Sequence, residues 1–393
     1  MILLSGKTLE QGSQFSLEPV EVITATIDLE EIRSYRSSIS RNVQAAQQAD
    51  STRVEWDIRL SQKELHILDP MTEIWMGTSV YLWQYLVRTS SPGFFLSLSG
   101  GLDSSTVALF VYGMPKVVLK SIEAGSKTTL ADLRRVTGMD TLVPKTPEEI
   151  VGLFANHMLY LYHQAVQASM AIINEALHFT LKYAVEGGTR SENLALQNIQ
   201  ARSRITTQYM LAQLVTTASQ SPRAGSPLLG LASGNVDENL RGYYTKYDAS
   251  SGDLAPLGSI SKNNAKLFQS WAMKAWDLPI LEELLTATPS AEPLPLPAGV
   301  QDDESESEMG LMYTELSTFG ILRKMAEKVM HFFRNYAINR HNATITTPSV
   351  HMSAYNPDDN RHDLRPFLYN VNWPFQFNKI RAHAEHLQNM MSK

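Results

Sequence analysis

Two short apolar runs, each followed by a polar turn that contains glycine, organise the hydrophobic pattern of this chain. Gly93-Phe94-Phe95-Leu96 and Leu228-Leu229-Gly230-Leu231-Ala232 have the length and composition of buried strands. After the first turn, apolar residues recur at helical spacing up to Pro115, where the pattern predicts that the helix ends. Strands that alternate with helices predict an α/β fold with an open parallel sheet and helices on both faces.

Other helices are predicted from their first residues. Asp69-Pro70 predicts a helix start, because a carboxylate caps the first turn and proline fits into it. Thr189 and Glu192 form a T-x-x-E capping box. Residues 325–336 are also predicted to be helical, whereas residues 153–162 fit either a buried helix or a second sheet strand.

Changes in composition divide the chain into three parts. Residues 1–36 predict strands, above all the β-branched run Val20–Ile27, and are too few to fold alone. We interpret them as the end of a larger α/β domain. Residues 37–68 are polar and predict a linker or surface arm, and residues 69–393 form the main domain. Within that domain, residues 286–308 are Pro-rich and then acidic, which is typical of a solvated linker.

Composition excludes several classes of protein. A net charge of −6 argues against a general nucleic-acid binder. The sequence has no apolar run of membrane-spanning length and no signal-peptide pattern, so we expect a soluble cytoplasmic protein with no membrane partner. With 0 cysteines, these 393 residues have no disulfide, no zinc–thiolate site and no cysteine nucleophile. The histidines of the last 60 or so residues have no zinc-like spacing.

The turn after the first strand reads Ser99-Gly100-Gly101-Leu102-Asp103-Ser104-Ser105. Its glycines let the backbone approach an anion closely, and the N–H groups and dipole of the following helix attract negative charge. Asp103 has the wrong sign for that purpose unless a cation lies between it and the phosphates. The turn therefore predicts a nucleotide–Mg²⁺ site, and the alternative is an ordinary Gly-rich turn capped by serine.

The second turn, from Ser233 to Glu238, also opens a helix. In an open α/β sheet both turns lie at the carboxyl ends of their strands, where ligands bind. We therefore expect Glu238 to face Asp103 and to complete a set of metal-binding carboxylates. Further charged residues lie in or beside a Gly/Ser-rich loop that follows, and we favour a functional reading of them over simple solvation: Lys246, Asp248, Asp253 and Lys262. Asn198 and Arg202, four residues apart, share one face of the helix that follows the capping box, either in a site or on a solvated surface.

The first turn is not G-x-x-x-x-G-K-[ST], so it does not indicate a P-loop NTPase. It resembles the signature of the ATP-pyrophosphatase (PP-loop) family. This resemblance implies an adenine nucleotide alpha hydrolase-like fold and cleavage of ATP between its α and β phosphates, which yields an adenylate.

Several co-linear stretches are similar to the synthetase half of the eukaryotic-type glutamine-dependent NAD⁺ synthetases. They are the residues 99–105 turn, Glu192–Arg202, Asn235–Glu238 with Thr245–Asp248 and Ile260–Lys262, Tyr336–His341 and Pro357–Arg361. Gln11–Ser16 is similar to the last strands of that family's nitrilase-like glutaminase domain. The resemblance implies that residues 1–36 are what this chain has of that domain.

The resemblance implies that nicotinate adenine dinucleotide (deamido-NAD), ATP and ammonia give NAD⁺, AMP and pyrophosphate through an acyl-adenylate. It implies ATP contacts for Ser99, Gly100, Gly101, Asp103, Ser104, Ser105, Ser233 and Lys262, with Asp103 and Glu238 holding Mg²⁺. Asp103, Glu238 and Lys262 are the implied catalytic residues. Asn198, Arg202, Lys246 and Asp253 are implied to bind the dinucleotide or to line the ammonia side of the cleft, and the chain is expected to form a homo-oligomer.

The sequence departs from the family in three places. The stretch between residues 158 and 185 is shorter and lacks a strand–helix unit expected near the adenine pocket, and a second segment is missing around residues 324–326. Asn342 stands where the family has lysine. Most of the glutaminase domain is absent, so we expect this chain to use ammonia at most.

Two rival hypotheses remain open. One is a non-catalytic nucleotide-binding remnant that pairs with full-length subunits. The other is a different PP-loop ligase, such as a GMP synthetase or a tRNA-modifying enzyme, although the tRNA option calls for a basic surface that the composition does not provide.

Overall fold

The computed structural model describes residues 1–4, 7–30, 32–33, 64–155, 163–286, 323–352 and 374–391. These residues fall into two compact units, residues 1–73 and residues 74–393. The predicted linker of residues 37–68 lies almost wholly outside the described residues, as do residues 287–308 of the predicted Pro-rich and acidic linker.

The first unit contains an antiparallel pair of strands, β1 (Ile2–Leu4) and β2 (Lys7–Glu10). The predicted strand Val20–Ile27 is wrong, because this run is irregular and its apolar side chains are exposed, with 75% exposure for Val20 and 79% for Val22. The β-branched side chains favour a strand, but a strand also needs a hydrogen-bonded neighbour, and none of the described residues provides one here.

The second unit is built on the parallel strands β3 (Phe94–Leu96) and β4 (Leu229–Leu231), as the two apolar runs predict. Phe94 pairs with Leu229 and Leu96 with Leu231, so both strands end at the same edge of the sheet. Two isolated parallel bridges continue the ladder, from Leu231 to Leu254 and from Ala255 to Ser349. Among the described residues, no strand pairs with the other edge of β3.

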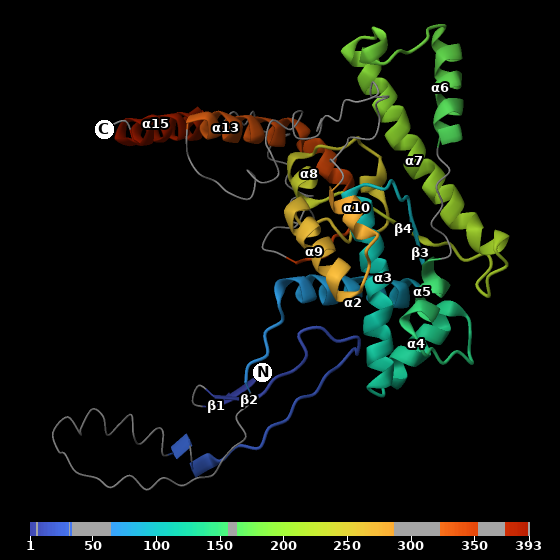
Figure 1. Ribbon diagram of the computed structural model, residues 1–393, viewed down its shortest axis with the longest axis vertical. Coiled ribbons are helices and arrows are strands. Elements are labelled where there is room, and N and C mark those ends of the chain that lie inside the picture. Colours follow the sequence, from blue (N-terminus) through green and yellow to red (C-terminus); the bar gives the residue numbers. More distant parts are fainter. Residues whose placement is uncertain are drawn as a thin grey trace. The chain divides into compact units, whose positions relative to one another are not determined.

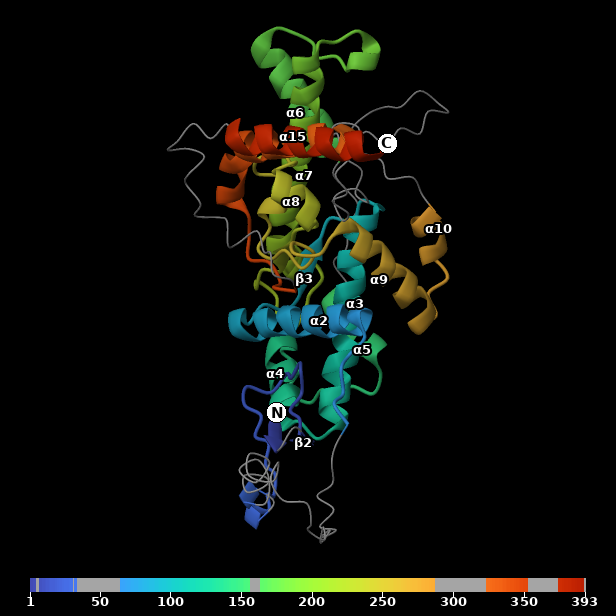
Figure 2. The same ribbon diagram turned by 90° about the vertical axis from the view of Figure 1, so that its left-hand side faces the viewer.

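Helices surround this narrow sheet (Figures 1 and 2). Those before β4 are α2 (Pro70–Thr89), α3 (Leu102–Glu123), α4 (Lys127–Thr137), α5 (Pro147–Ala155), α6 (His163–Leu177) and α7 (Arg190–Ala218), with the 3-10 turn η2 (Ala184–Glu186). Those after it are α8 (Val236–Arg241), α9 (Lys262–Ala275), α10 (Leu281–Thr286), α13 (Arg323–Ile338) and α15 (Pro374–Met391), with η3 (Ala249–Ser251) and η4 (Asn339–Ile345).

Several predicted helix starts are confirmed. The Asp69 carboxylate accepts hydrogen bonds from the N–H groups of Met71 and Thr72, each 3.1 Å long, at the start of α2. The capping box of α7 is formed in both directions between Thr189 and Glu192. The stretch that was left open between helix and strand is helical as far as Ala155 and then leaves the described residues.

The prediction that Pro115 ends its helix is wrong, because α3 continues to Glu123. Proline inside a helix costs about 3 kcal/mol, since one backbone hydrogen bond is lost. The residues beyond it, Val117, Val118 and Leu119, are buried, and each buried side chain contributes about 1.5–3 kcal/mol. Tertiary packing therefore outweighs the local penalty. α3 is also long and apolar enough to cross a membrane, but 67% of the relevant window is buried inside the protein, which is typical of a core helix.

An aromatic cluster fixes α9 against α2 and α3, which cross each other in both ribbon views (Figures 1 and 2). Phe268 of α9 packs on Phe110 of α3, with 5.0 Å between ring centroids, and stacks on Trp271 at 5.6 Å. Trp75 of α2 donates a 2.9 Å hydrogen bond to the carbonyl of Gly113, where a Cβ would come within 2.8 Å of two tryptophan rings. These contacts hold α9 in one orientation against α2 and α3.

Replacing Phe268 with alanine tests this packing. The side chain is fully buried, so Phe268→Ala is expected to lower the free energy of unfolding by about 3–5 kcal/mol in urea denaturation. The neighbouring Leu267 is 57% exposed, and Leu267→Ala is expected to change the free energy of unfolding by no more than about 0.5 kcal/mol. Equal losses in the two variants would contradict the proposed role of the cluster.

Candidate nucleotide and metal site

The turn between β3 and α3 is open on the side that the first N–H groups of α3 face. Gly100 has a φ of +87°, which glycine adopts without strain, and no atom lies within 4 Å of the position where a Cβ would be. Gly101 caps α3 without any side-chain hydrogen bond to the helix N–H groups. The Ser99 and Ser104 hydroxyl groups lie 3.0 Å apart, and they accept hydrogen bonds from the N–H groups of Gly101 (3.2 Å) and Ser99 (3.3 Å), so contacts within the turn hold the loop in shape.

The turn after β4 is closed by a side-chain cap. Asn235 is fully buried, and its Oδ1 accepts hydrogen bonds from the N–H groups of Asp237 (3.0 Å) and Glu238 (3.1 Å). The Nδ2 group of the same amide donates a 3.2 Å hydrogen bond to Oδ1 of Asp103. The two turns are therefore joined directly, and the structure brings the two carboxylates predicted for the metal to one place.

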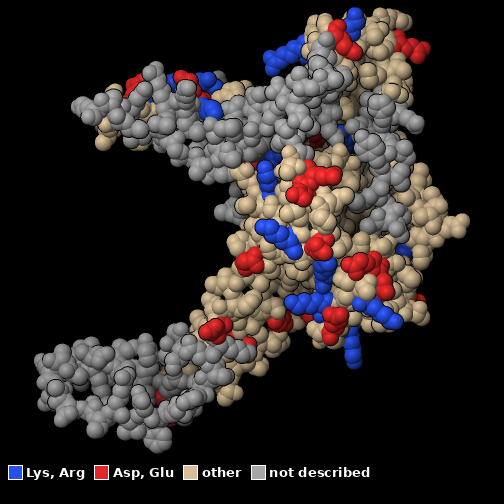
Figure 3. Space-filling model, in the orientation of Figure 1, with Lys and Arg blue, Asp and Glu red and all other residues tan. Residues whose placement is uncertain are grey.

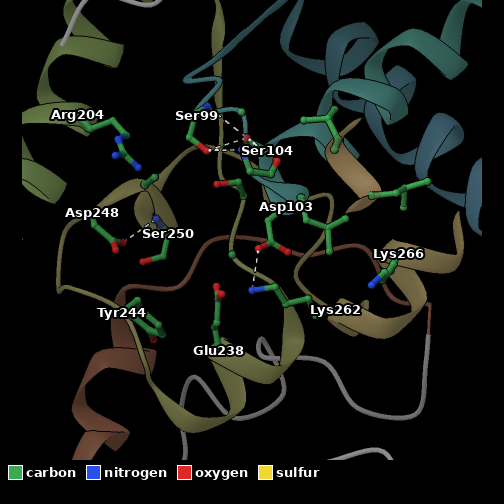
Figure 4. A pocket seen from close by; sticks show the side chains of 18 residues that line it. Ser99, Asp103, Ser104, Arg204, Glu238, Tyr244, Asp248, Ser250, Lys262 and Lys266 are labelled. Carbon is green, nitrogen blue, oxygen red and sulfur yellow. Dashed lines mark hydrogen bonds and ion pairs between the residues drawn. The ribbon is translucent and has the colours of Figure 1, made fainter. Parts of the chain in front are cut away.

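A cavity of about 410 Å³ opens between these turns (Figure 4). Figure 4 shows Asp103, Glu238 and Lys262 converging on one region of it. Eight of the residues predicted from sequence to bind ATP or metal line this cavity, namely Ser99, Gly100, Gly101, Asp103, Ser104, Ser233, Glu238 and Lys262. Ser105 does not line it, and 6% of this residue is exposed.

The charges in the cavity are partly removed from water. Lys262 Nζ lies 3.7 Å from Asp103 Oδ2, with side-chain exposures of 11% and 21%. Burial raises the pKa of Asp103, and the Lys262 ammonium opposes that rise. Burial and the nearby Asp103 carboxylate raise the pKa of Glu238 to about 8. Burial disfavours the ionised form of both carboxylates, and a bound cation would relieve both of them.

The donor set fits Mg²⁺. This ion is usually held by one or two carboxylates together with substrate phosphates, and not by an all-protein cage. Asp103 and Glu238 supply two carboxylates in a cavity that the Ser99–Ser104 turn also lines. Among the residues that the structure describes, no group of three or more His, Cys, Asp or Glu side chains is arranged to hold a metal ion.

Several residues that line the cavity were not assigned a role from the sequence. Lys266 lies one helical turn after Lys262 on α9, a spacing that could have identified it. Arg204 projects from α7, and Ser250 comes from the loop after α8. Asp248 comes from the same loop, and the sequence favoured a function for it without assigning a specific one. Burial raises the pKa of Asp248, although hydrogen bonds from the Ser250 and Thr245 N–H groups oppose this. Leu284 and Leu285 of α10 add an apolar wall that no sequence pattern indicated.

The four residues predicted to bind substrate lie outside this cavity. Asn198 accepts a 2.8 Å hydrogen bond from the Thr245 hydroxyl, and Arg202 donates one of 3.0 Å to the carbonyl of Lys246. α7 thereby holds the loop that carries Asp248.

Asp253 lies at a different part of the sheet. It accepts hydrogen bonds from the N–H of Gly230 (2.7 Å) and from the hydroxyl of Tyr209 (3.1 Å), and it lines a second cavity of about 700 Å³. Lys246 places its ammonium group 5.4 Å from the ring centroid of Tyr247. The substrate-binding roles of these residues stay predictions.

Comparison with known proteins identifies the family of this chain. The family model described as NAD synthase matches residues 74–356, which covers most of the second unit and both turns. The chain belongs to the NAD synthase family. The glutamine-dependent NAD(+) synthetase of Rattus norvegicus is 38% identical over 96% of this chain, and that of Drosophila melanogaster is 39% identical over 98%.

A crystal structure of a glutamine-dependent NAD(+) synthetase from Cytophaga hutchinsonii shares the fold. It covers 80% of this chain and 56% of its own, with a TM-score of 0.55 and 23% sequence identity. This similarity supports the expected α/β fold with its parallel sheet.

The chain is shorter than these family members in two senses. It spans 60% of the length of the rat protein and 57% of the Drosophila protein. The alignment with the Drosophila protein runs over 458 positions, more than the 393 residues of this chain, so it contains many internal gaps. Internal shortening was expected from the sequence, and the unpaired edge of β3 among the described residues agrees with it.

The raised pKa of Glu238 makes stability depend on pH. Between 4.5 and about 8, the folded protein retains the Glu238 proton, whereas the unfolded chain has lost it. The unfolded state then binds fewer protons, so the free energy of unfolding should fall as pH rises through this window. Chemical denaturation at several pH values, without added divalent cation, measures the slope. Glu238→Gln should flatten the slope, and a slope that is unchanged in this variant would contradict the assignment.

Proposed function

We propose that this chain catalyses the ammonia-dependent amidation of deamido-NAD to NAD⁺, with conversion of ATP to AMP and pyrophosphate. The observation that carries the proposal is the single cavity in which the Ser99–Ser104 turn, the two carboxylates and Lys262 meet. Membership of the NAD synthase family supports the same reaction. Because the 393 residues include no cysteine, the nitrogen donor that we propose for them is free ammonia.

The proposed chemistry needs an activated acid group, because a carboxylate is a poor electrophile. An oxygen of the nicotinate carboxylate attacks the α-phosphorus of ATP, the bond to the β-phosphate oxygen breaks, and pyrophosphate leaves with the bonding electrons. Ammonia then attacks the acyl carbon, AMP leaves, and one proton is released as the amide forms. Neither step needs a covalent bond to the protein, so the side chains bind, orient and neutralise charge.

The residues in the cavity suit these tasks. Backbone N–H groups at the start of α3, with the Ser99 and Ser104 hydroxyls, would bind phosphate oxygens. Asp103 and Glu238 would hold Mg²⁺, which when bound neutralises the charge that develops on the phosphates. Lys262 and Lys266 project from one face of α9 into the cavity and would neutralise the departing pyrophosphate.

A nucleotide-binding remnant without turnover is the second candidate function. The open edge of β3 among the described residues favours it, since this edge lies beside the nucleotide turn. A basic nucleic-acid-binding surface has less support, because acidic and basic side chains are interspersed on the face drawn in Figure 3.

The activity assay uses the purified chain with deamido-NAD, Mg-ATP and ammonium chloride, and it measures NAD⁺ and pyrophosphate together. Equal amounts of the two products are expected. Asp103→Asn and Glu238→Gln should each lower turnover by about a hundredfold or more, because each removes charge stabilisation at the transition state.

The matched control for this assay is Asp132→Asn, which removes a carboxylate on α4 outside the cavity and should leave turnover unchanged. ATP binding in calorimetry without any NAD⁺ would favour the remnant. Full activity in both cavity variants would contradict the assignment of Asp103 and Glu238.

A further inference from the structure

The contacts of the Asn235 side chain are not explained by helix capping alone. As the N-cap of α8 it would need only an acceptor oxygen for the N–H groups of Asp237 and Glu238. Its side chain is, however, fully buried, and the other half of the amide donates to Oδ1 of Asp103 over 3.2 Å. One neutral side chain therefore contacts the backbone of one metal-binding residue and the carboxylate of the other.

Few residue types provide both contacts. Serine, threonine and aspartate also cap helices well, but an amide presents an acceptor and two donor hydrogens at opposite ends of one rigid group. Aspartate at this position would place a second carboxylate against Asp103, and serine is too short to span the gap between the two turns. Asparagine is thus long enough to reach both turns, and it adds no charge beside Asp103.

The same hydrogen-bonded segment reaches the cavity's lysine. The N–H of Val236 donates to the carbonyl of Ile260 (3.1 Å), and Asp237 Oδ2 accepts the backbone N–H of Lys262 (2.9 Å). The start of α8 is therefore tied to the start of α9 as well as to α3. Asp103, Glu238 and Lys262 are each connected to Asn235 either directly or through one residue.

We infer that Asn235 is a positioning residue that holds the Asp103 and Glu238 carboxylates at the separation a divalent cation requires before the cation binds. Without such a link, the two turns could move apart whenever both carboxylates are ionised, because separation lowers their repulsion. A cation would then have to draw the two turns back together, at a cost in affinity. This inference rests on the proposed function, because it concerns the same metal site.

The test compares Mn²⁺ binding in the presence of ATP, followed by electron paramagnetic resonance, in the unsubstituted protein and in Asn235→Ser. Mn²⁺ is the probe because carboxylate sites that hold Mg²⁺ also bind it. Serine keeps the cap of α8 but removes the donor to Asp103. The dissociation constant for Mn²⁺ should rise about tenfold or more, as for other residues that orient metal ligands.

Two further variants separate positioning from a general loss of stability. Ser126 caps α4 through a 2.9 Å hydrogen bond from the N–H of Thr129 and does not line the cavity. Ser126→Ala therefore removes a helix cap but should leave Mn²⁺ affinity unchanged. Asn235→Thr keeps a capping hydroxyl and fills more of the buried space, so it gives the same comparison if the serine variant does not fold.

The inference is supported if Mn²⁺ binds more weakly to the Asn235 variant but not to Ser126→Ala. If that variant is less stable but binds Mn²⁺ as tightly as the unsubstituted protein, Asn235 is only a helix cap and the inference is overturned. If the unsubstituted protein itself binds no Mn²⁺ with ATP, the proposed function fails and the inference fails with it. The first negative result is seen in the Asn235 variant and the second in the unsubstituted protein, so the two failures can be distinguished.

Discussion

Two parallel strands that end at the same edge of a sheet place two carboxyl groups close together. The other residues of the site compensate for the cost of that arrangement. β3 leads to Asp103 and β4 leads to Glu238, in registers that end at Leu96 and Leu231. Burial makes each carboxylate costly to ionise, and Asp103 raises the cost further for Glu238. Lys262 offsets part of that cost, and the arrangement favours a ligand that brings both a cation and phosphate groups.

Buried amides hold the elements that carry these charges. Besides Asn235, Gln208 of α7 accepts a hydrogen bond from the Ser97 hydroxyl (2.9 Å) and donates one to the carbonyl of Leu231 (3.3 Å), which ties α7 to the ends of both strands. Gln269 of α9 donates to the carbonyl of Leu102 and to the hydroxyl of Thr106, both at 2.8 Å, at the start of α3. Burying a neutral amide costs far less than burying a charge, although Oε1 of Gln269 has no hydrogen-bond partner among the described residues. The amides can therefore fix the geometry without adding to the electrostatic strain.

The sequence predicted the features that depend on neighbouring residues. The two apolar runs, the capping box at Thr189 and the N-cap at Asp69 have local causes, and the structure confirms each of them. The meeting of Asp103 and Glu238 was also predictable, because it follows from where parallel strands end.

Features that depend on distant packing were not predictable. α3 runs through Pro115 because buried residues follow it, and Val20–Ile27 is irregular because it has no strand partner among the described residues. Arg204 and Leu284 reach the cavity only through the packing of their helices. The double contact of Asn235 depends on the distance between two turns, which no spacing in the sequence encodes.

A crystal structure of the protein with Mg²⁺ and α,β-methylene-ATP, which resists cleavage between the α and β phosphates, tests the central claim most directly. We expect one metal ion with a carboxylate oxygen of Asp103 and one of Glu238 about 2.1 Å away, and phosphate groups against the Ser99–Ser104 turn. Nucleotide bound in another cavity, or a metal ion that neither carboxylate contacts, would contradict the claim.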